Sequence, residues 1–259
     1  MPPRALSPSG LILADKPAGP TSFDVVARIR RRTGARTGHA GTLDPFASGL
    51  LLVLSGAATR LAPWLAGVDK RYLTEVDLTA RTATGDPEGD VVEKGEPPDE
   101  AELERRLATL RGEIELRIPA ASAVKIGGER AYRLHRRGEA VEMPLRRSRV
   151  DALEVIGYSD GIAQLDLRVG SGTYVRAIAD ALGGHCRMLR RIEVGPFSVD
   201  DADEKRILPA AEALPFLPAV EVSAEEAAAI RGGRIRAQVG VRTLSDGELV
   251  AVGRVVMPV

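Results

Sequence analysis

A glycine-rich loop that runs directly into an apolar segment constrains this chain more than any other stretch. Residues 38–52 read GHAGTLDPFASGLLL, and an apolar run continues to Leu54. Glycine permits positive φ and a close approach of the backbone, which favours a tight loop. A short apolar run bounded by glycine predicts a buried strand. We therefore expect a stiff loop that presents Asp44 at the edge of a core strand, a location suited to chemistry.

Other interpretations of this loop follow from its composition. Asp before Pro often starts a turn, so the composition alone favours a structural turn. A phosphate-binding loop is excluded because no Gly-Lys-Ser/Thr follows the glycines. A metal site is not expected, since His39 and Asp44 are five positions apart and no other His, Cys or carboxylate is close in sequence.

The same stretch resembles the signature of the TruB family of tRNA pseudouridine synthases. That signature is G-H-x-G-x-L-D-P-x-A-x-G-x-L, and every fixed position is filled here. The resemblance implies that Asp44 is the nucleophile. It extends over about residues 10–200 and includes DKPAGPTS at 15–22, which is similar to the family's N-terminal motif and is expected to brace the catalytic loop.

Two further motifs imply catalytic partners for Asp44. Lys-Arg-Tyr at 70–72 resembles the family's second motif, which implies that Tyr72 stacks on the target base and assists the late proton removal. SGTYVR at 171–176 resembles the third motif, which implies that Arg176 pairs with Asp44. Such a pair would keep the carboxylate ionised. Without the resemblance, Tyr72 would be an ordinary strand tyrosine and Arg176 an exposed residue in the first turn of a helix.

The resemblance also implies a pocket for the base. Leu189, in a segment similar to L-R-R-x-x-x-G-x-F, would form its apolar wall, and Tyr174 would pack against the site of the flipped nucleotide. His39 would wedge into the space that the nucleotide vacates or hold the flipped strand. A hydrogen bond that stabilises the loop is an equal alternative for His39.

A basic segment follows residues 119–125, PAASAVK, which resemble the family's P-x-x-Y-S-A-x-K. The tyrosine of that pattern is Ala121 here, so no role of the ring is carried over. The resemblance implies that this segment closes over the RNA. Lys125, Arg130 and Arg133 are candidate phosphate contacts there, and so are Arg136 and Arg137.

Charge is segregated along the chain, although 36 Lys and Arg balance 36 Asp and Glu. Residues 125–149 carry eight basic and three acidic side chains, whereas residues 81–104 carry nine acidic and two basic ones. Local potential governs phosphate binding more than net charge does. We expect a basic face toward RNA, with the acidic segment away from it. The single cysteine, Cys186, excludes an internal disulfide and a cysteine-based zinc site.

Sequence patterns together with the family resemblance predict an α+β fold, a mixed and mainly antiparallel sheet flanked by helices. The expected organisation is a disordered tail at 1–9, a catalytic domain at 10–205, and a linker plus a reduced, β-rich PUA-like RNA-binding domain at 206–259. Within it, Thr173 should cap a helix that runs to Leu182. In the C-terminal segment, strands are expected at 235–241 and 249–256. About 40 residues are too few for a comfortable core of their own, so we expect this segment to dock on the catalytic domain.

The family resemblance implies conversion of the uridine at position 55, in the T-loop of tRNA, to pseudouridine without a cofactor. Attack at C1′, glycal formation and addition at C6 all remain open for Asp44. The expected partner is the tRNA T-stem-loop, bound by a cytoplasmic monomer with no membrane segment and no obligatory protein partner. A non-catalytic tRNA-binding or tRNA-folding protein is the alternative. A guide-RNA-dependent synthase is a third interpretation. It would normally need partner proteins and a larger C-terminal RNA domain, so the short C-terminal segment argues against it.

Overall fold

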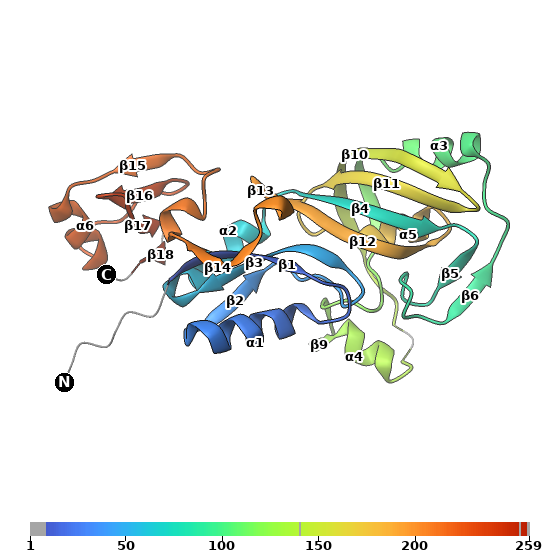
Figure 1. Cartoon of the computed structure of the whole chain (residues 1–259), viewed down its shortest axis with the longest axis horizontal. Helices are drawn as coiled ribbons and strands as arrows, with labels where there is room; N and C mark the ends of the chain where they lie inside the picture. Colours follow the sequence, from blue (N-terminus) through green and yellow to red (C-terminus); the bar gives the residue numbers. More distant parts are fainter. Residues whose placement is uncertain (1–8, 140, 254, 258–259) are drawn as a thin grey trace. The chain divides into compact units, whose positions relative to one another are not determined.

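The protein, seen in a computed structural model, is described over residues 9–139, 141–253 and 255–257 (Figure 1). Apart from Ser9, the tail expected at 1–9 lies outside the described residues. The chain divides into two compact units. The first unit comprises Met1–Val68 and Glu193–Val259, and the second comprises Asp69–Ile192. This division falls inside one strand, β12 (His185–Val194), which starts in the second unit and ends in the first.

The first unit begins with the elements that carry the Asp44 loop. They are β1 (Gly10–Lys16), α1 (Ser22–Thr33), β2 (Thr37–Ala40), β3 (Ser48–Ser55), a 3-10 helix (Gly56–Leu61) and α2 (Ala62–Ala66). After β12 come β13 (Phe197–Ser198), a 3-10 helix (Val199–Asp201), β14 (Asp203–Leu208), a 3-10 helix (Ala210–Glu212), β15 (Ala219–Glu221), α6 (Ala224–Arg231), β16 (Arg242–Ser245), β17 (Glu248–Val252) and β18 (Val255–Val256).

The apolar run after the Asp44 loop forms β3, as the sequence predicts. β3 pairs antiparallel with β1 from Gly49 to Ser55 and also with β2, while β14 pairs with the other edge of β1. Helix α1 packs on these strands through Val25, Val26 and Ile29, which are buried. The helix ends at Gly34, whose φ of 65° is a left-handed conformation that glycine adopts at little cost.

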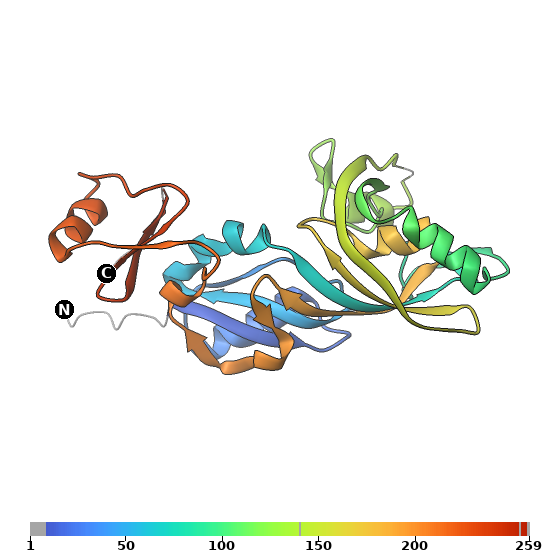
Figure 2. The same ribbon diagram turned by 90° about the horizontal axis from the view of Figure 1, so that it is seen from above.

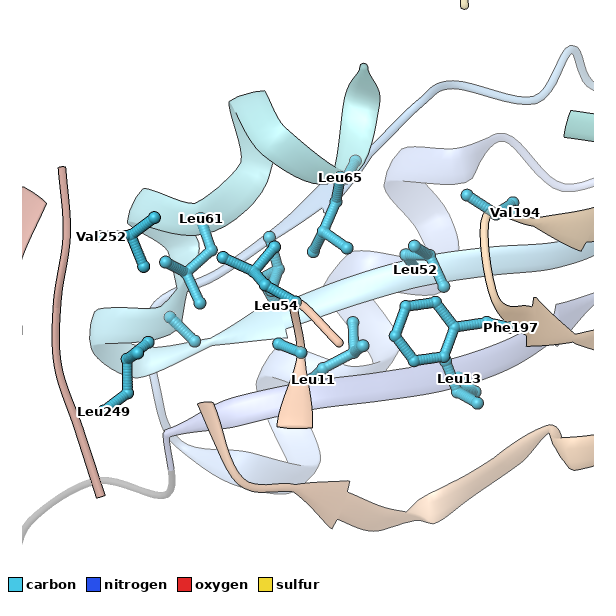
Figure 3. Packing of buried hydrophobic residues seen from close by; sticks show 14 of the residues in the cluster. Leu11, Leu13, Leu52, Leu54, Leu61, Leu65, Val194, Phe197, Leu249 and Val252 are labelled. Atoms are coloured by element: carbon cyan, nitrogen blue, oxygen red, sulfur yellow. The ribbon is translucent and has the colours of Figure 1, made fainter. Parts of the chain in front are cut away.

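The core of the first unit joins its N-terminal and C-terminal segments. Leu11, Leu52 and Leu54 from β1 and β3 lie in one cluster with Leu249 and Val252 from β17 (Figure 3). All five side chains are buried. The C-terminal segment therefore shares a hydrophobic core with the strands that hold the Asp44 loop.

The C-terminal segment is β-rich, as expected, but one of its strands is elsewhere. Its sheet has the order β15-β16-β17-β18, with β15 and β16 parallel. The prediction of a strand at 235–241 is wrong, because these residues are irregular and Ile235 and Val239 are exposed. The following residues form β16 instead. The alternating pattern does not give a strand here, because it leaves Ile235 and Val239 in solvent and buries only Val241, next to the start of β16.

The second unit contains the remaining elements. They are β4 (Lys70–Asp77), β5 (Ala80–Thr82), β6 (Val91–Lys94), α3 (Glu100–Ala108), β7 (Gly112–Arg117), β8 (Lys125–Ile126), β9 (Glu129–Arg130), α4 (Ala131–Arg136), β10 (Leu145–Ser159), β11 (Ile162–Val169), α5 (Val175–Ala181) and the first part of β12.

The strands of the second unit follow the order β12-β4-β11-β10-β7. Strands β10 and β11 form an antiparallel hairpin, the long yellow strands seen from above in Figure 2. It turns at Asp160 and Gly161, both with positive φ. The prediction of an α+β fold with a mainly antiparallel sheet is confirmed. Across the described part of the chain, no helix has the length and apolar character needed to cross a membrane.

Candidate active site

Asp44 lies in the irregular segment between β2 and β3 and is half-buried. Gly41 and Gly49 flank this segment with φ of 85° and 105°, a region that favours glycine. Within it, the Ala47 amide donates to the Asp44 carbonyl oxygen at 3.2 Å. His39 is on β2, opposite Val53 of β3. Asp44 therefore lies in the connection of the β2–β3 hairpin, and His39 lies on the strand that leads into it.

The buried Lys16 holds the backbone of Pro45, the residue that follows Asp44. The Lys16 ammonium donates to the carbonyl oxygens of Pro17, Pro20 and Pro45, at 2.9, 2.7 and 3.1 Å. The Gly19 amide also donates to Pro45, at 2.8 Å. The residue after Asp44 is therefore tied to the loop between β1 and α1. This is the contact expected from the motif at 15–22.

Tyr72 is buried on β4, where the side chains of alternate residues share a face. Lys70 and Thr74 are buried on that face as well, and the Thr74 hydroxyl donates to the Met188 carbonyl of β12 at 2.6 Å. Leu189, the next residue of β12, is buried. Burial and, to a smaller extent, the nearby Arg191 together lower the pKa of Lys70 to about 8. Sequence analysis assigned no role to Lys70.

Arg176 is not the exposed first-turn residue that its position alone suggests. It is buried in α5, whose N-cap is Tyr174, so the cap predicted at Thr173 is wrong. The guanidinium donates to the carbonyls of Thr84 and Ala121, at 2.7 and 2.9 Å. Its orientation is therefore fixed by backbone atoms from two loops of the second unit.

Asp86 is a residue that sequence analysis missed. Its carboxylate lies 3.2 Å from the Arg176 guanidinium, and the two side chains are only 7% and 2% exposed. The same carboxylate accepts from the Thr84 hydroxyl at 2.5 Å and from the Glu88 amide at 3.1 Å. A buried charge of this kind requires a partner. Only its place in a turn-rich loop, TGDPEG, was visible in the sequence.

Tyr174 and the basic segment meet in one cluster of the second unit. Tyr174 packs on buried Ile118, Ala131 and Met143. Lys125 and Arg130 are exposed and face each other across the β8–β9 hairpin. Arg133 is also exposed, and its guanidinium lies 5.9 Å from the ring centre of Tyr132. The candidate phosphate contacts Lys125, Arg130 and Arg133 thus belong to one short β8–β9–α4 segment.

Each unit thus holds part of the predicted site. The first unit contains Asp44 and His39 on one hairpin, and the second contains Tyr72, Tyr174, Arg176 and Leu189. The pairing of Arg176 with Asp44 stays a prediction. Among the described residues, no group of three or more His, Cys, Asp or Glu is arranged to hold a metal ion.

The family model described as TruB family pseudouridylate synthase (N terminal domain) matches residues 29–175 of this chain. The chain belongs to the TruB family. The tRNA pseudouridine synthase B of Mycobacterium sp. (strain KMS) is 42% identical to it over 94% of this chain and 91% of that protein. The protein of the same name from Nocardia farcinica is 43% identical over 97% and 91%.

Solved structures share the fold of this chain. A Cbf5-Nop10-Gar1 complex contains a chain with a TM-score of 0.72 and 27% identity, covering 97% of this chain and 80% of that one. An H/ACA RNP bound to a substrate RNA containing 2'-deoxyuridine gives a TM-score of 0.69 and 26% identity, over 93% and 76%. The family resemblance expected from the sequence is confirmed, and with it the class of enzyme, an isomerase that forms pseudouridine.

Proposed function

We propose that this protein converts the uridine at position 55, in the T-loop of tRNA, to pseudouridine, with Asp44 as the nucleophile. The observation that carries the proposal is the match, over nearly the whole chain, to relatives named tRNA pseudouridine synthase B. The complete signature around Asp44, placed between β2 and β3, supports the choice of nucleophile.

The reaction is an isomerisation whose atoms balance within the RNA. The bond from C1′ to N1 of uracil breaks, the base turns, and a bond from C1′ to C5 forms. The proton on C5 is lost and N1 gains one, so neither an oxidant nor a group donor is consumed. A carboxylate can carry the ribose or the base through this exchange as a covalent partner. Asp44 suits that role because the contacts of Lys16 and Gly19 with Pro45 fix the loop beside it.

The other predicted residues supply the surroundings of the base. A uridine in a folded loop must leave its stack to be reached, so the enzyme would flip it into a pocket. Tyr72 would stack on the base and take part in the removal of the C5 proton, Leu189 would form the apolar wall, and Tyr174 would pack beside the nucleotide. Arg176 would keep Asp44 ionised, and its buried position in α5 suits a fixed cation.

RNA binding is assigned to the basic segment and to His39. The exposed Lys125, Arg130 and Arg133 would contact phosphates, and His39 would hold the strand from which the base is flipped. Recognition of a folded RNA loop rests largely on shape and backbone contacts. We propose that the chain performs these steps alone, as a monomer without a guide RNA or a protein partner.

The test uses an unmodified elongator tRNA transcript labelled with tritium at C5 of uridine. Purified wild type and Asp44→Asn are incubated with it without metal or cofactor, and tritium release and the modified position are measured. Asp201→Asn is the matched control, because Asp201 is an exposed carboxylate of the same unit. We expect release by wild type and the control at a single T-loop position, and none by Asp44→Asn.

Other outcomes separate the alternatives. Release by Asp44→Asn at the wild-type rate would show that Asp44 is not the nucleophile. An absence of release from all three proteins, with tight salt-sensitive tRNA binding, would favour the non-catalytic tRNA-binding protein. Activity only after addition of a guide RNA or partner proteins would favour the guide-dependent synthase.

A further inference from the structure

Ser22 makes two hydrogen bonds to the residue that precedes Asp44. Its hydroxyl donates to the Leu43 carbonyl oxygen at 2.9 Å and accepts from the Leu43 amide at 2.8 Å. Ser22 is only 2% exposed, and Leu43 is buried. One side chain thus satisfies both backbone groups of Leu43, which lies outside the paired residues of β2 and β3. A side chain that donates and accepts at one atom is needed for this, and a hydroxyl provides it.

The hydroxyl of Ser22 is not used by the helix in which it lies. A serine at a helix N-terminus commonly caps the helix, but Thr21 is the N-cap of α1. The Thr21 hydroxyl accepts from the Asp24 amide at 3.1 Å, and the Asp24 carboxylate accepts from the Thr21 amide at 2.8 Å. This capping box satisfies the start of the helix without Ser22. The contact of Ser22 therefore serves the loop that carries Asp44.

Helix α1 gives Ser22 a fixed position. Val25, Val26 and Ile29 bury the inner face of the helix against β1, β2 and β3. On the other side of Asp44, Lys16 and Gly19 hold Pro45. The backbone is consequently held immediately before and immediately after Asp44, and all of these contacts lie within the first unit.

We propose that Ser22 is a positioning residue for the reaction. By holding Leu43, it would set the direction from which the Asp44 carboxylate approaches the flipped nucleotide. This inference rests on the proposed role of Asp44 as nucleophile. Reactions of bound groups are sensitive to geometry, and a displacement of about 1 Å can cost 100-fold in rate. Because Ser22 is buried, RNA binding by the exposed basic segment should not depend on it.

The experiment compares wild type, Ser22→Ala, Ser22→Thr and Ser55→Ala. Ser55 is the matched control, because it is also a buried serine and lies at the opposite end of β3 from the Asp44 loop. Single-turnover rates of pseudouridine formation, the Kd for tRNA and the thermal unfolding midpoint are measured for each. We expect a rate about 10- to 100-fold lower for Ser22→Ala, with a Kd within twofold of wild type. Threonine keeps the hydroxyl, so Ser22→Thr should recover most of the rate.

The proposal would be overturned if Ser22→Ala reacted at the wild-type rate or changed only the Kd. It would also be overturned if Ser55→Ala lost as much rate as Ser22→Ala, or if Ser22→Thr reacted no faster than Ser22→Ala. An unfolding midpoint lowered equally in Ser22→Ala and Ser55→Ala, together with the rate loss in Ser22→Ala only, would support positioning over general destabilisation. Failure of the proposed function is recognised separately, because wild type itself would then form no pseudouridine.

Discussion

Arg176 is held by oxygen atoms from three residues that are distant in sequence. The carbonyls of Thr84 and Ala121 and the carboxylate of Asp86 lie within 2.7 to 3.2 Å of its guanidinium. The carbonyls fix the direction of the planar group, and the carboxylate balances its charge in a buried environment. Asp86 therefore gives the buried Arg176 a counterion and helps to fix its position within the second unit.

Replacing Asp86 by Asn should affect both stability and catalysis. Asn keeps the shape of the side chain but leaves the buried guanidinium without this carboxylate, and breaking a buried ion pair typically costs about 3–5 kcal/mol. We expect Asp86→Asn to lower the free energy of unfolding by that order, as measured by urea titration. It should also lower kcat for pseudouridine formation more than it raises KM, because Arg176 would lose its fixed orientation.

A surface pair of the same type is the control for Asp86. Arg81 and Asp180 lie 2.6 Å apart, but their side chains are 39% and 46% exposed. Exposed ion pairs contribute about 0–1 kcal/mol, so Asp180→Asn should change the unfolding free energy by no more than that. Equal effects of the two substitutions would refute a special role for Asp86.

At the residue level, sequence motifs identify the candidate catalytic side chains but not the residues that hold them in place. Asp44, Tyr72 and Arg176 stand in motifs and could be named from them. Asp86 could not, because its segment at 82–98 is acidic and turn-rich and was expected to lie away from RNA as a whole. The burial of one carboxylate in such a segment depends on Arg176, which is 90 positions further along the chain, and no local pattern reports that contact.

The β8–β9–α4 segment shows that basic residues close in sequence differ in available charge. Lys125 and Arg130 face each other across the hairpin, an arrangement of like charges that costs stability. Arg137 is instead bound by Glu129 and Glu139, at 2.6 Å each. These carboxylates raise the pKa of Arg137 and neutralise its charge locally. An anionic ligand would relieve the repulsion between Lys125 and Arg130, whereas Arg137 already has its counterions.

Salt dependence of tRNA binding should distinguish these arginines. Each phosphate contact contributes about one unit to the slope of log K against log salt concentration. We expect Arg130→Ala to weaken binding and to reduce the slope by about one. Arg137→Ala should change both much less. The measurement is a filter-binding titration with tRNA at several salt concentrations, and a slope for Arg130→Ala equal to that of wild type would show that Arg130 makes no phosphate contact.

At the level of elements, apolar patterns predict the strands that pack in the core and fail in a segment that is mostly exposed. The run from Leu50 to Leu54 forms β3 and the alternation at 162–170 forms β11, because each has strands on which to pack. The segment at 235–241 has a similar alternation, but Ile235 and Val239 are exposed and no strand pairs with them. The N-caps of the helices differ in the same way from what single residues suggest. Thr21 caps α1 through a capping box with Asp24, whereas the N-cap of α5 is Tyr174 and not Thr173.

The molecule as a whole groups segments that the sequence separates. Composition suggests a boundary near residue 205, with the segment beyond it docked on the catalytic domain. The contacts instead place residues from Glu193 onward with Met1–Val68. A segment of about 50 residues buries too little surface to be stable alone, so it gains a core by sharing one. The shared core is formed by apolar side chains such as Leu249 and Val252, which cluster with residues that are distant in sequence.

Truncating Leu249 should therefore destabilise the unit that holds Asp44, not only the C-terminal sheet. Leu249 is 6% exposed and clusters with Leu54 and Leu61, whereas the control Val239 is 78% exposed. A buried Leu→Ala change costs about 2–5 kcal/mol, so the main urea transition of Leu249→Ala should shift to lower concentration, while Val239→Ala should not shift it. Residues of a shared core lose their packing together, which predicts one transition by circular dichroism and by the fluorescence of Trp64, a residue that packs on the same cluster. A separate early transition, with the Trp64 signal unchanged, would show instead that the C-terminal sheet unfolds independently.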